Sequence, residues 1–199
     1  MLEFKNISGW FNYSKLYDEM VEKALENSTF VELGVFKGAS AAHMCKSIFN
    51  SNKKINFYAI DWFKGSIEHD YMPEHFPEHL FGSNRDNWLY QHCIENLEPA
   101  IKLGLVNVIK KSAMDALSLF DDNTIDFCFH DASHEYEDLM QELPLWWNKI
   151  KPGGYFGGHD YGNWSFVGVS RAVNKLAEQY DLHITYRANE DSWLIQKPY

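Results

Sequence analysis

The residues that could do chemistry gather in two short stretches in the second half of the chain. Asp131 and His134 follow one apolar run, and His159 and Asp160 follow another. Carboxylates suit a hard divalent cation and an imidazole titrates near neutral pH, so these side chains could hold a metal ion or move a proton. If both runs are strands of one parallel sheet, their carboxyl ends bring these side chains to the same crevice.

A second group of residues suits a nucleotide cofactor. An apolar, β-rich run over Thr29–Val35 contains one acid, Glu32, and leads through Gly34 and Gly38 into a helical pattern. Strand, glycine turn and helix form the first unit of a nucleotide-binding α/β sheet. A dinucleotide fingerprint requires glycine where Phe36 stands, so close approach by a pyrophosphate is disfavoured. Glu32 also needs a partner, because a lone carboxylate is costly to bury.

Asp61 and Ser112 follow the next two apolar runs. Asp61 lies 23 residues after Gly38, the interval at which an acid accepts the hydroxyls of a ribose. The alternative role for Asp61 is a turn or helix-capping aspartate. The small side chains around Ser112 would leave room for a flat base, and Ser112 could also cap the following helix.

A doubly wound, mostly parallel α/β sheet with helices on both faces would position these groups. Seven strands are predicted, with an antiparallel hairpin at the end, over residues 29–35, 55–60, 106–110, 124–129, 155–158, 182–187 and 192–196. Helices are predicted over residues 10–27, 39–49, 85–97, 112–120, 137–150 and 167–180. Pro99 should end the third of these helices and Pro144 should kink or divide the fifth. Residues 151–154 are expected to form a turn.

The length of 199 residues favours a single domain over 1–199. The helix over 10–27 should pack against the sheet, although it could cover the cofactor pocket or a partner subunit instead. Residues 62–99 exceed what a connection between strand and helix needs, which favours a lid-like insertion that shapes the substrate pocket.

Composition excludes several classes of protein. The net charge of −10 and the absence of a basic run disfavour a nucleic-acid partner. No apolar run is long enough to span a membrane, and the N-terminus lacks a signal-peptide pattern. The cysteines are odd in number and scattered, as expected of reduced cytosolic thiols. We therefore expect a cytoplasmic protein that does not bind membranes.

Two motifs resemble known enzymes. The run Glu32-x-Gly34-x-x-x-Gly38 resembles the first motif of class I S-adenosylmethionine (SAM) methyltransferases. The most specific match is the block DFCFHDASHEY with WWNKIKPGGYFGGHDY, which resembles the branch that includes macrocin O-methyltransferase and cephalosporin hydroxylase-type proteins. The resemblance spans residues 30–196. It implies SAM contacts at Glu32, Gly34, Gly38, Ser40, Asp61, Trp62, Ser112, Ala113, Met114 and Asp131.

Members of that branch bind magnesium with an aspartate after the fourth strand and an acidic pair after the fifth. Asp131 and Asp160 match two of these acids, and His159 stands where the macrocin type has an acid. The resemblance implies Mg²⁺ at Asp131, His159 and Asp160, and an imidazole at His159 would shift the preference toward Mn²⁺ or another transition metal. In the metal-free alternative, Asp160 orients His159 as a base.

The implied reaction is O-methylation of a hydroxyl on a small molecule or sugar. Such a hydroxyl needs a base, a metal ion or both, and Asp131, His134 and His159 are the candidate catalytic residues. His134 could equally be a structural residue of its loop. Two alternatives are a SAM-binding protein without transferase activity and a Rossmann-type NAD-dependent oxidoreductase. The chain could also form a homodimer.

Overall fold

The computed structural model describes residues 2–65 and 85–199. In chain order the elements are α1 (Ser14–Lys23), β1 (Ser28–Leu33), α2 (Ala39–Ser51), β2 (Ile55–Asp61), α3 (Arg85–Lys102), β3 (Asn107–Lys110), α4 (Ala113–Ala116), the 3₁₀ helix η4 (Leu117–Leu119), β4 (Ile125–His130), α5 (Tyr136–Lys149), β5 (Ile150–Gly158), the 3₁₀ helix η5 (Trp164–Phe166), α6 (Val167–Tyr180), β6 (Thr185–Arg187) and β7 (Ser192–Gln196).

The strands form one seven-stranded mixed sheet in the order β3-β2-β1-β4-β5-β7-β6. The first five strands in the chain pair in parallel, and β7 runs antiparallel to both of its neighbours. Leu33 at the end of β1 lies level with Ile60 on one side and His130 on the other. The parallel strands therefore end at one edge, and the predicted fold class and strand count are confirmed.

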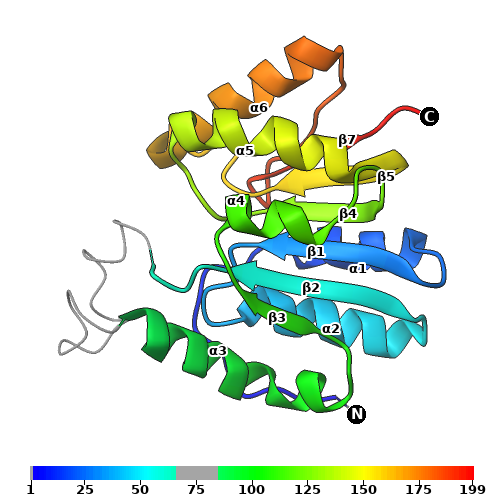
Figure 1. Ribbon diagram of the computed structural model, residues 1–199, viewed down its shortest axis with the longest axis vertical. Helices are drawn as coiled ribbons and strands as arrows, with labels where there is room; N and C mark the ends of the chain where they lie inside the picture. The colour runs from blue at the N-terminus through cyan, green and yellow to red at the C-terminus, as the bar shows by residue number, and fades with distance from the viewer. Residues whose placement is uncertain (1, 66–84) are drawn as a thin grey trace.

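Helices cover both faces of the sheet (Figure 1). One face carries α1, α2 and α3, which pack on side chains such as Phe30 and Phe127. The other carries α4, α5 and α6, which pack on the alternate residues Val31 and Cys128. Because both faces are buried, the central strands are apolar along their length and leave polar groups for the strand ends.

The N-terminal helix is shorter than predicted. The predicted range is 10–27, whereas α1 covers Ser14–Lys23. Residues 9–13 line a cleft at the ends of the strands instead. The helical spacing of apolar residues extends past the real helix because Tyr13 is buried and Phe11 is half-buried, and both line the cleft.

Prolines caused two further errors, and Pro144 does not divide its helix, while the kink expected there stays a prediction. Residues 151–154 form no separate turn, because β5 begins at Ile150 and Pro152 lies at a register shift between β4 and β5, where its missing N–H is tolerated. The third helix passes Pro99 and ends at Lys102, and α5 continues through Pro144. In these two helices, burial of the neighbouring apolar side chains outweighs the loss of one hydrogen bond.

Two other elements are shorter than predicted. The helix expected over 112–120 is one turn of α-helix followed by η4. The strand expected over 182–187 covers Thr185–Arg187 only.

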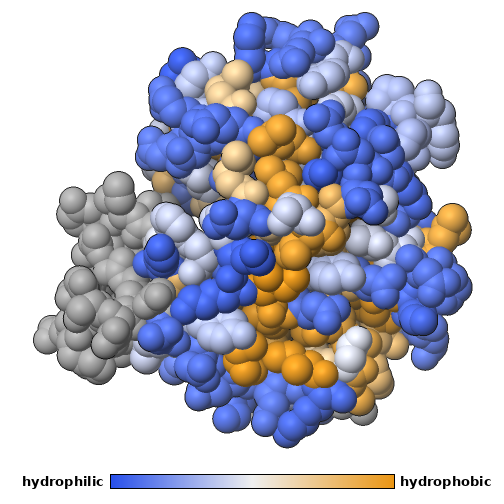
Figure 2. All heavy atoms as spheres, viewed as in Figure 1, coloured by the Kyte–Doolittle hydropathy of each residue, from blue (hydrophilic) through white to orange (hydrophobic). Residues whose placement is uncertain are grey.

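Over the short helices, apolar side chains form a strip down the face shown in Figure 2. Among the described residues, no helix is long and apolar enough to cross a membrane.

The insertion predicted over 62–99 can be followed only in part. Residues 66–84 lie outside the described part of the chain, and α3 occupies the remainder from Arg85 onward. The proposed lid therefore stays a prediction.

Candidate active site

A cleft of about 680 Å³ lies at the carboxyl ends of the parallel strands. It contains most of the predicted site residues. Those that line it are Gly34, Ser40, Asp61, Trp62, Ser112, Ala113, Asp131, His134, His159 and Asp160. Glu32, Gly38 and Met114 are not part of its lining.

Close contacts within the protein fix the backbone conformation of the glycine turn. Gly34 has φ +86°, and a Cβ at this position would lie 1.8 Å from the carbonyl oxygen of Asp131. Gly38 has φ +91° and packs against the side chain of Leu97. Both glycines are thus required by the backbone conformation and by close neighbours.

Asp61 holds the glycine turn in place. Its Oδ2 accepts the backbone N–H groups of Val35 and Phe36, both at 2.8 Å, and its Oδ1 accepts that of Phe63 at 2.6 Å. A carboxylate can accept about four hydrogen bonds, so roughly one position is left for a ligand. Burial raises the pKa of Asp61 despite these three donors. The ribose contact stays a prediction. The hydrogen bond from Phe63 fits the turn aspartate named as the alternative, and the support of the glycine turn goes beyond both expectations.

Glu32 lies beneath the cleft and is 1% exposed. Its Oε1 accepts the hydroxyl of Ser40, which begins the helix after the glycine turn. Its Oε2 has no hydrogen-bond partner among the described residues. Burial outweighs the Ser40 hydrogen bond and raises the pKa of Glu32 to about 8. The sequence analysis expected a partner for this buried acid, and that partner is Ser40.

The third strand end supplies an open wall of the cleft. Ser112 is the N-cap of α4, and its hydroxyl oxygen accepts the N–H of Asp115 at 3.1 Å. Ala113 follows it, while Met114 points elsewhere and is 40% exposed. Trp62, at the end of β2, is 48% exposed on the cleft rim. A flat ring could be bound between these small and aromatic side chains.

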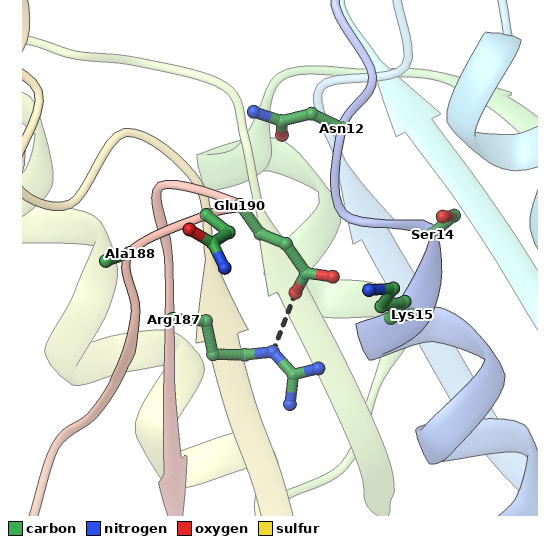
Figure 3. A pocket seen from close by; sticks show the side chains of 7 residues that line it. Asn12, Ser14, Lys15, Arg187, Ala188 and Glu190 are labelled. Atoms are coloured by element: carbon green, nitrogen blue, oxygen red, sulfur yellow. Dashed lines mark hydrogen bonds and ion pairs between the residues drawn. The ribbon is translucent and has the colours of Figure 1, made fainter.

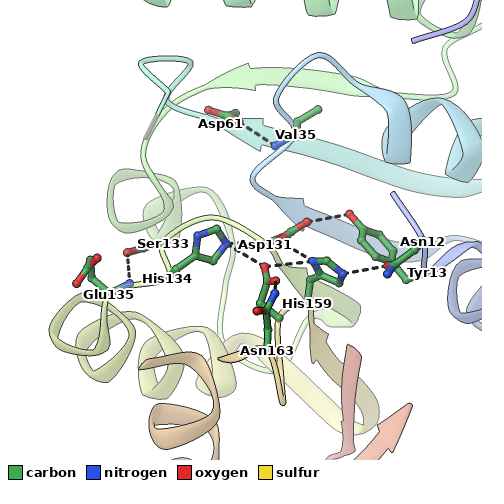
Figure 4. A network of polar contacts seen from close by, with 11 residues as sticks. Asn12, Tyr13, Val35, Asp61, Asp131, Ser133, His134, Glu135, His159 and Asn163 are labelled. Atoms are coloured by element: carbon green, nitrogen blue, oxygen red, sulfur yellow. Dashed lines mark hydrogen bonds and ion pairs between the residues drawn. The ribbon is translucent and has the colours of Figure 1, made fainter. Parts of the chain in front are cut away.

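The opposite end of the cleft brings two acids and two imidazoles together (Figure 4). Nε2 of His134 lies 3.1 Å from Oδ2 of Asp160 and 3.9 Å from Oδ1 of Asp131. Nδ1 of His159 lies 3.2 Å and 3.7 Å from the same two oxygens. Asp131, His134 and Asp160 offer ligand atoms within 4.8 Å of one another, which is compatible with a metal ion.

The charges at this end stabilise one another. Burial alone would raise the pKa of Asp131 and Asp160, but hydrogen bonds from His134 and His159 outweigh it and lower both. Burial would lower the pKa of His159, yet the two carboxylates raise it to about 10. Both acids are therefore ionised at neutral pH, and they attract a cation.

Two residues that the sequence reasoning missed contact this group. The hydroxyl of Tyr13 donates to Oδ2 of Asp131 at 2.9 Å, and Oδ1 of Asn12 lies 2.9 Å from Nε2 of His159. Both precede α1 and lie more than a hundred positions from their partners. No local motif could have indicated either contact.

A second cavity of about 370 Å³ adjoins the cleft at Asn12 (Figure 3). It lies between the start of α1 and the turn after β6. Arg187 in its lining is held by Glu190 and Glu19, each at 2.7 Å. The ion pair with Glu19 joins the final hairpin to α1, and the two acids balance the guanidinium charge within the protein.

The seven-stranded order, the glycine turn and the cleft at the strand ends define a class I SAM-dependent methyltransferase. A family model described as a methyltransferase domain matches residues 31–161. This match covers more than half of the chain, and the protein belongs to that family. No curated protein sequence matches the chain.

Solved structures with the same fold include several O-methyltransferases. The O-methyltransferase NovP has a TM-score of 0.65 at 17% identity, covering 94% of this chain and 80% of its own. TomG from Streptomyces achromogenes, solved with SAM, has a TM-score of 0.61 at 15% identity over 98% of this chain and 82% of its own. An O-methyltransferase from Bacillus cereus, solved with SAH, has a TM-score of 0.59 at 15% identity over 98% of this chain and 84% of its own.

Proposed function

We propose that the protein transfers a methyl group from SAM to a hydroxyl of a small molecule or sugar, with a divalent cation at the catalytic end. The observation that carries this proposal is the group of two carboxylates and two imidazoles in the same cleft as the glycine turn. A methyltransferase mainly positions two reactants and removes one proton, and this arrangement suits both tasks.

The residues present fit SAM. The cofactor supplies an activated methyl group on its sulfonium. The turn from Gly34 to Phe36 and the wall formed by Trp62 and Ala113 would hold it, with Asp61 offering one remaining acceptor position. The unpartnered Oε2 of Glu32 beneath Ser40 is a further acceptor close to the turn. The structural relatives TomG and the Bacillus cereus enzyme, solved with SAM and SAH, support this choice.

The residues present also fit a divalent cation. The ionised oxygens of Asp131 and Asp160 would hold it, and either imidazole could complete the set. We favour His159, because its other ring nitrogen is held by Asn12, as is usual for a metal-ligating histidine. A bound cation lowers the pKa of a hydroxyl that contacts it. When the two carboxylates hold the cation in place of the imidazole hydrogen, the imidazole of His134, stacked on Phe166 at 4.1 Å between ring centroids, would accept the proton of the acceptor.

A chelation experiment tests the function and the metal separately. The full chain is titrated with SAH and with NAD by calorimetry, and is then assayed with SAM against a panel of sugars and phenols. SAH should bind and NAD should not. EDTA should abolish turnover, and Mg²⁺ or Mn²⁺ should restore it while SAH affinity is unchanged.

The outcomes distinguish the alternatives. Full turnover after exhaustive chelation would make the metal proposal wrong and favour the metal-free pair of His159 and Asp160. SAH binding without turnover on any acceptor would favour a SAM-binding protein without transferase activity. Binding of NAD instead of SAH would contradict the methyltransferase assignment. The homodimer and the cytoplasmic location remain predictions.

A further inference from the structure

The N-terminal segment before α1 reaches into the catalytic end of the cleft. We propose that Asn12 and Tyr13 are positioning residues for methyl transfer, with Tyr13 fixing the carboxylate of Asp131 and Asn12 fixing the ring of His159. This inference rests on the proposed function, which makes Asp131 and His159 catalytic groups. It assigns a role in the reaction to a segment that the sequence analysis expected to pack against the sheet, or to cover the cofactor pocket or a partner subunit.

Tyr13 makes the two oxygens of Asp131 different from each other. Its hydroxyl donates to Oδ2 at 2.9 Å, which leaves Oδ1 to face His134 and His159 at 3.9 and 3.7 Å. The ring is 1% exposed and lies 4.5 Å from Phe129 and 4.9 Å from His159 between centroids. A buried ring between two neighbours has little freedom to rotate, so the hydroxyl fixes the orientation of the carboxylate.

Asn12 fixes the orientation of the His159 ring. Its amide Oδ1 lies 2.9 Å from Nε2, and an amide oxygen can only accept. With Nε2 held by Asn12, Nδ1 is the nitrogen that faces Asp131 and Asp160. Loss of this contact would release the ring to turn and to exchange its two nitrogens.

Both contacts come from consecutive residues that are held by one helix. The helix α1 begins at Ser14, and its residues Leu16 and Tyr17 are completely buried. Asn12 and Tyr13 are thereby fixed relative to the sheet, and the catalytic groups are fixed relative to them. The N-terminal segment thus completes the site, although it lies outside the matched family region that begins at residue 31.

The matched control for Tyr13 is Tyr17. Both are buried tyrosines whose rings pack on Phe129, with centroid distances of 4.5 and 5.1 Å. The hydroxyl of Tyr17 has no hydrogen-bond partner among the described residues. Tyr13→Phe and Tyr17→Phe therefore remove the same atom from similar surroundings, and only the first removes a contact with Asp131.

Nuclear magnetic resonance of the full chain labelled with ¹⁵N-histidine tests the positioning without any acceptor, and His159→Gln assigns the signals. The wild-type spectrum should show an exchange-protected Nε2–H proton of His159. Asn12→Ala should lose that signal and Asn12→Asp, which retains an acceptor oxygen, should restore it. Tyr13→Phe should shift both ring nitrogens, and Tyr17→Phe should shift neither.

Persistence of the Nε2–H signal in Asn12→Ala would overturn the role of Asn12. Coincident His159 spectra of Tyr13→Phe and Tyr17→Phe would overturn the role of Tyr13. If Tyr13→Phe does not fold, unchanged His159 signals together with unchanged turnover in Asn12→Ala overturn the proposal.

A kinetic measurement provides the second readout. With any acceptor that the wild type methylates, Tyr13→Phe should lower kcat about 10- to 100-fold, as for other residues that orient an active group, with KM for SAM changed by less than about twofold. Tyr17→Phe should leave both constants unchanged. If the wild type methylates nothing, the proposed function fails, whereas the ring signals of His159 still decide whether Asn12 and Tyr13 position it.

Discussion

The two ends of the cleft hold their acids in different ways. At the cofactor end, Asp61 accepts three backbone N–H groups and Glu32 accepts one hydroxyl, so the hydrogen bonds that both acids accept come from uncharged donors. At the catalytic end, Asp131 and Asp160 face the imidazoles of His134 and His159. The same residue type therefore serves as a structural support at one end and as part of a titrating network at the other.

The difference follows from what each donor can do. A backbone N–H cannot release its proton at neutral pH, so the carboxylate that accepts it fixes a shape. An imidazole can gain or lose a proton, so an acid beside it forms a pair whose charge can change during a reaction. Substitutions at the cofactor end should change folding and affinity, while substitutions at the catalytic end should change the rate.

The largest effect is expected where the two ends touch. Gly34→Ala places a Cβ 1.8 Å from the carbonyl oxygen of Asp131 at a φ of +86°. The turn and the loop after β4 cannot both keep their places, so we expect a loss of about 4 kcal/mol or more in the free energy of unfolding. Urea denaturation measures this loss.

Gly104→Ala is the matched control. Gly104 also has a positive φ, +68°, but nothing lies within 4 Å of the added Cβ. Only the backbone strain of about 1 to 2 kcal/mol should appear. If the two variants lose the same free energy of unfolding, the backbone of Gly34 is not tightly packed against Asp131. The two ends of the cleft would then not be coupled through this contact.

The next largest effect is on the rate. Asp131→Asn keeps the shape of the side chain and removes the charge that His134 and His159 face. Turnover should fall about 10²- to 10⁴-fold, the range typical of a lost acid–base group, with SAH affinity changed by less than about twofold. Steady-state kinetics and calorimetry on the same preparation check both. A large loss of SAH affinity would place Asp131 at the cofactor end instead.

Asp61→Ala should lower SAH affinity, which Asp131→Asn leaves nearly unchanged, and its effect should be smaller than the loss of turnover in Asp131→Asn. It leaves two backbone N–H groups of the glycine turn and that of Phe63 without their acceptor, so the free energy of SAH binding should weaken by about 1–3 kcal/mol. Asp126→Ala is the control, because Asp126 also accepts a backbone N–H, from Thr29 at 2.8 Å, near the start of β1 and away from the cleft. It should cost stability but leave SAH affinity unchanged. Equal affinity in both variants would contradict a role for Asp61 in shaping the site.

The sequence predicts the two ends unequally. The glycine turn, Asp61 and the helix between them follow closely in the chain, so their types and spacing are enough to indicate the cofactor end. Asp131 and Asp160 can also be identified, because both follow apolar strands of the same sheet. A turn role for Asp61 was named as an alternative, but its hydrogen bonds from Val35 and Phe36 were not foreseen, because a contact with distant backbone leaves no trace in residue types.

The remaining misses share a physical cause. The contacts of Asn12 and Tyr13 join segments separated by 147 and 118 positions, and only tertiary packing creates them. The errors at Pro99 and Pro152 arose because local propensity was weighed without the burial that opposes it. Periodicity sets the order of elements well, but it does not show which buried aromatic side chains face the sheet and which face the site.

The smallest predicted effect concerns the pH dependence of stability. Burial raises the pKa of Glu32 to about 8, above that of an exposed glutamate. Below about pH 4.5 the folded and unfolded chains both carry this proton, and between there and about pH 8 only the folded chain does. The folded state thus binds more protons in this window, so the contribution of Glu32 to stability falls as pH rises, by at most about 1.4 kcal/mol per pH unit. Glu32→Gln removes this contribution while keeping an oxygen for Ser40. Its free energy of unfolding relative to the wild type, measured by urea denaturation, should therefore rise steadily from pH 5 to pH 8. Taking the difference between the two proteins cancels the contributions of the other titrating groups. A constant difference across this range would mean that Glu32 is ionised in the folded protein, and that the cofactor end carries a buried charge as the catalytic end does.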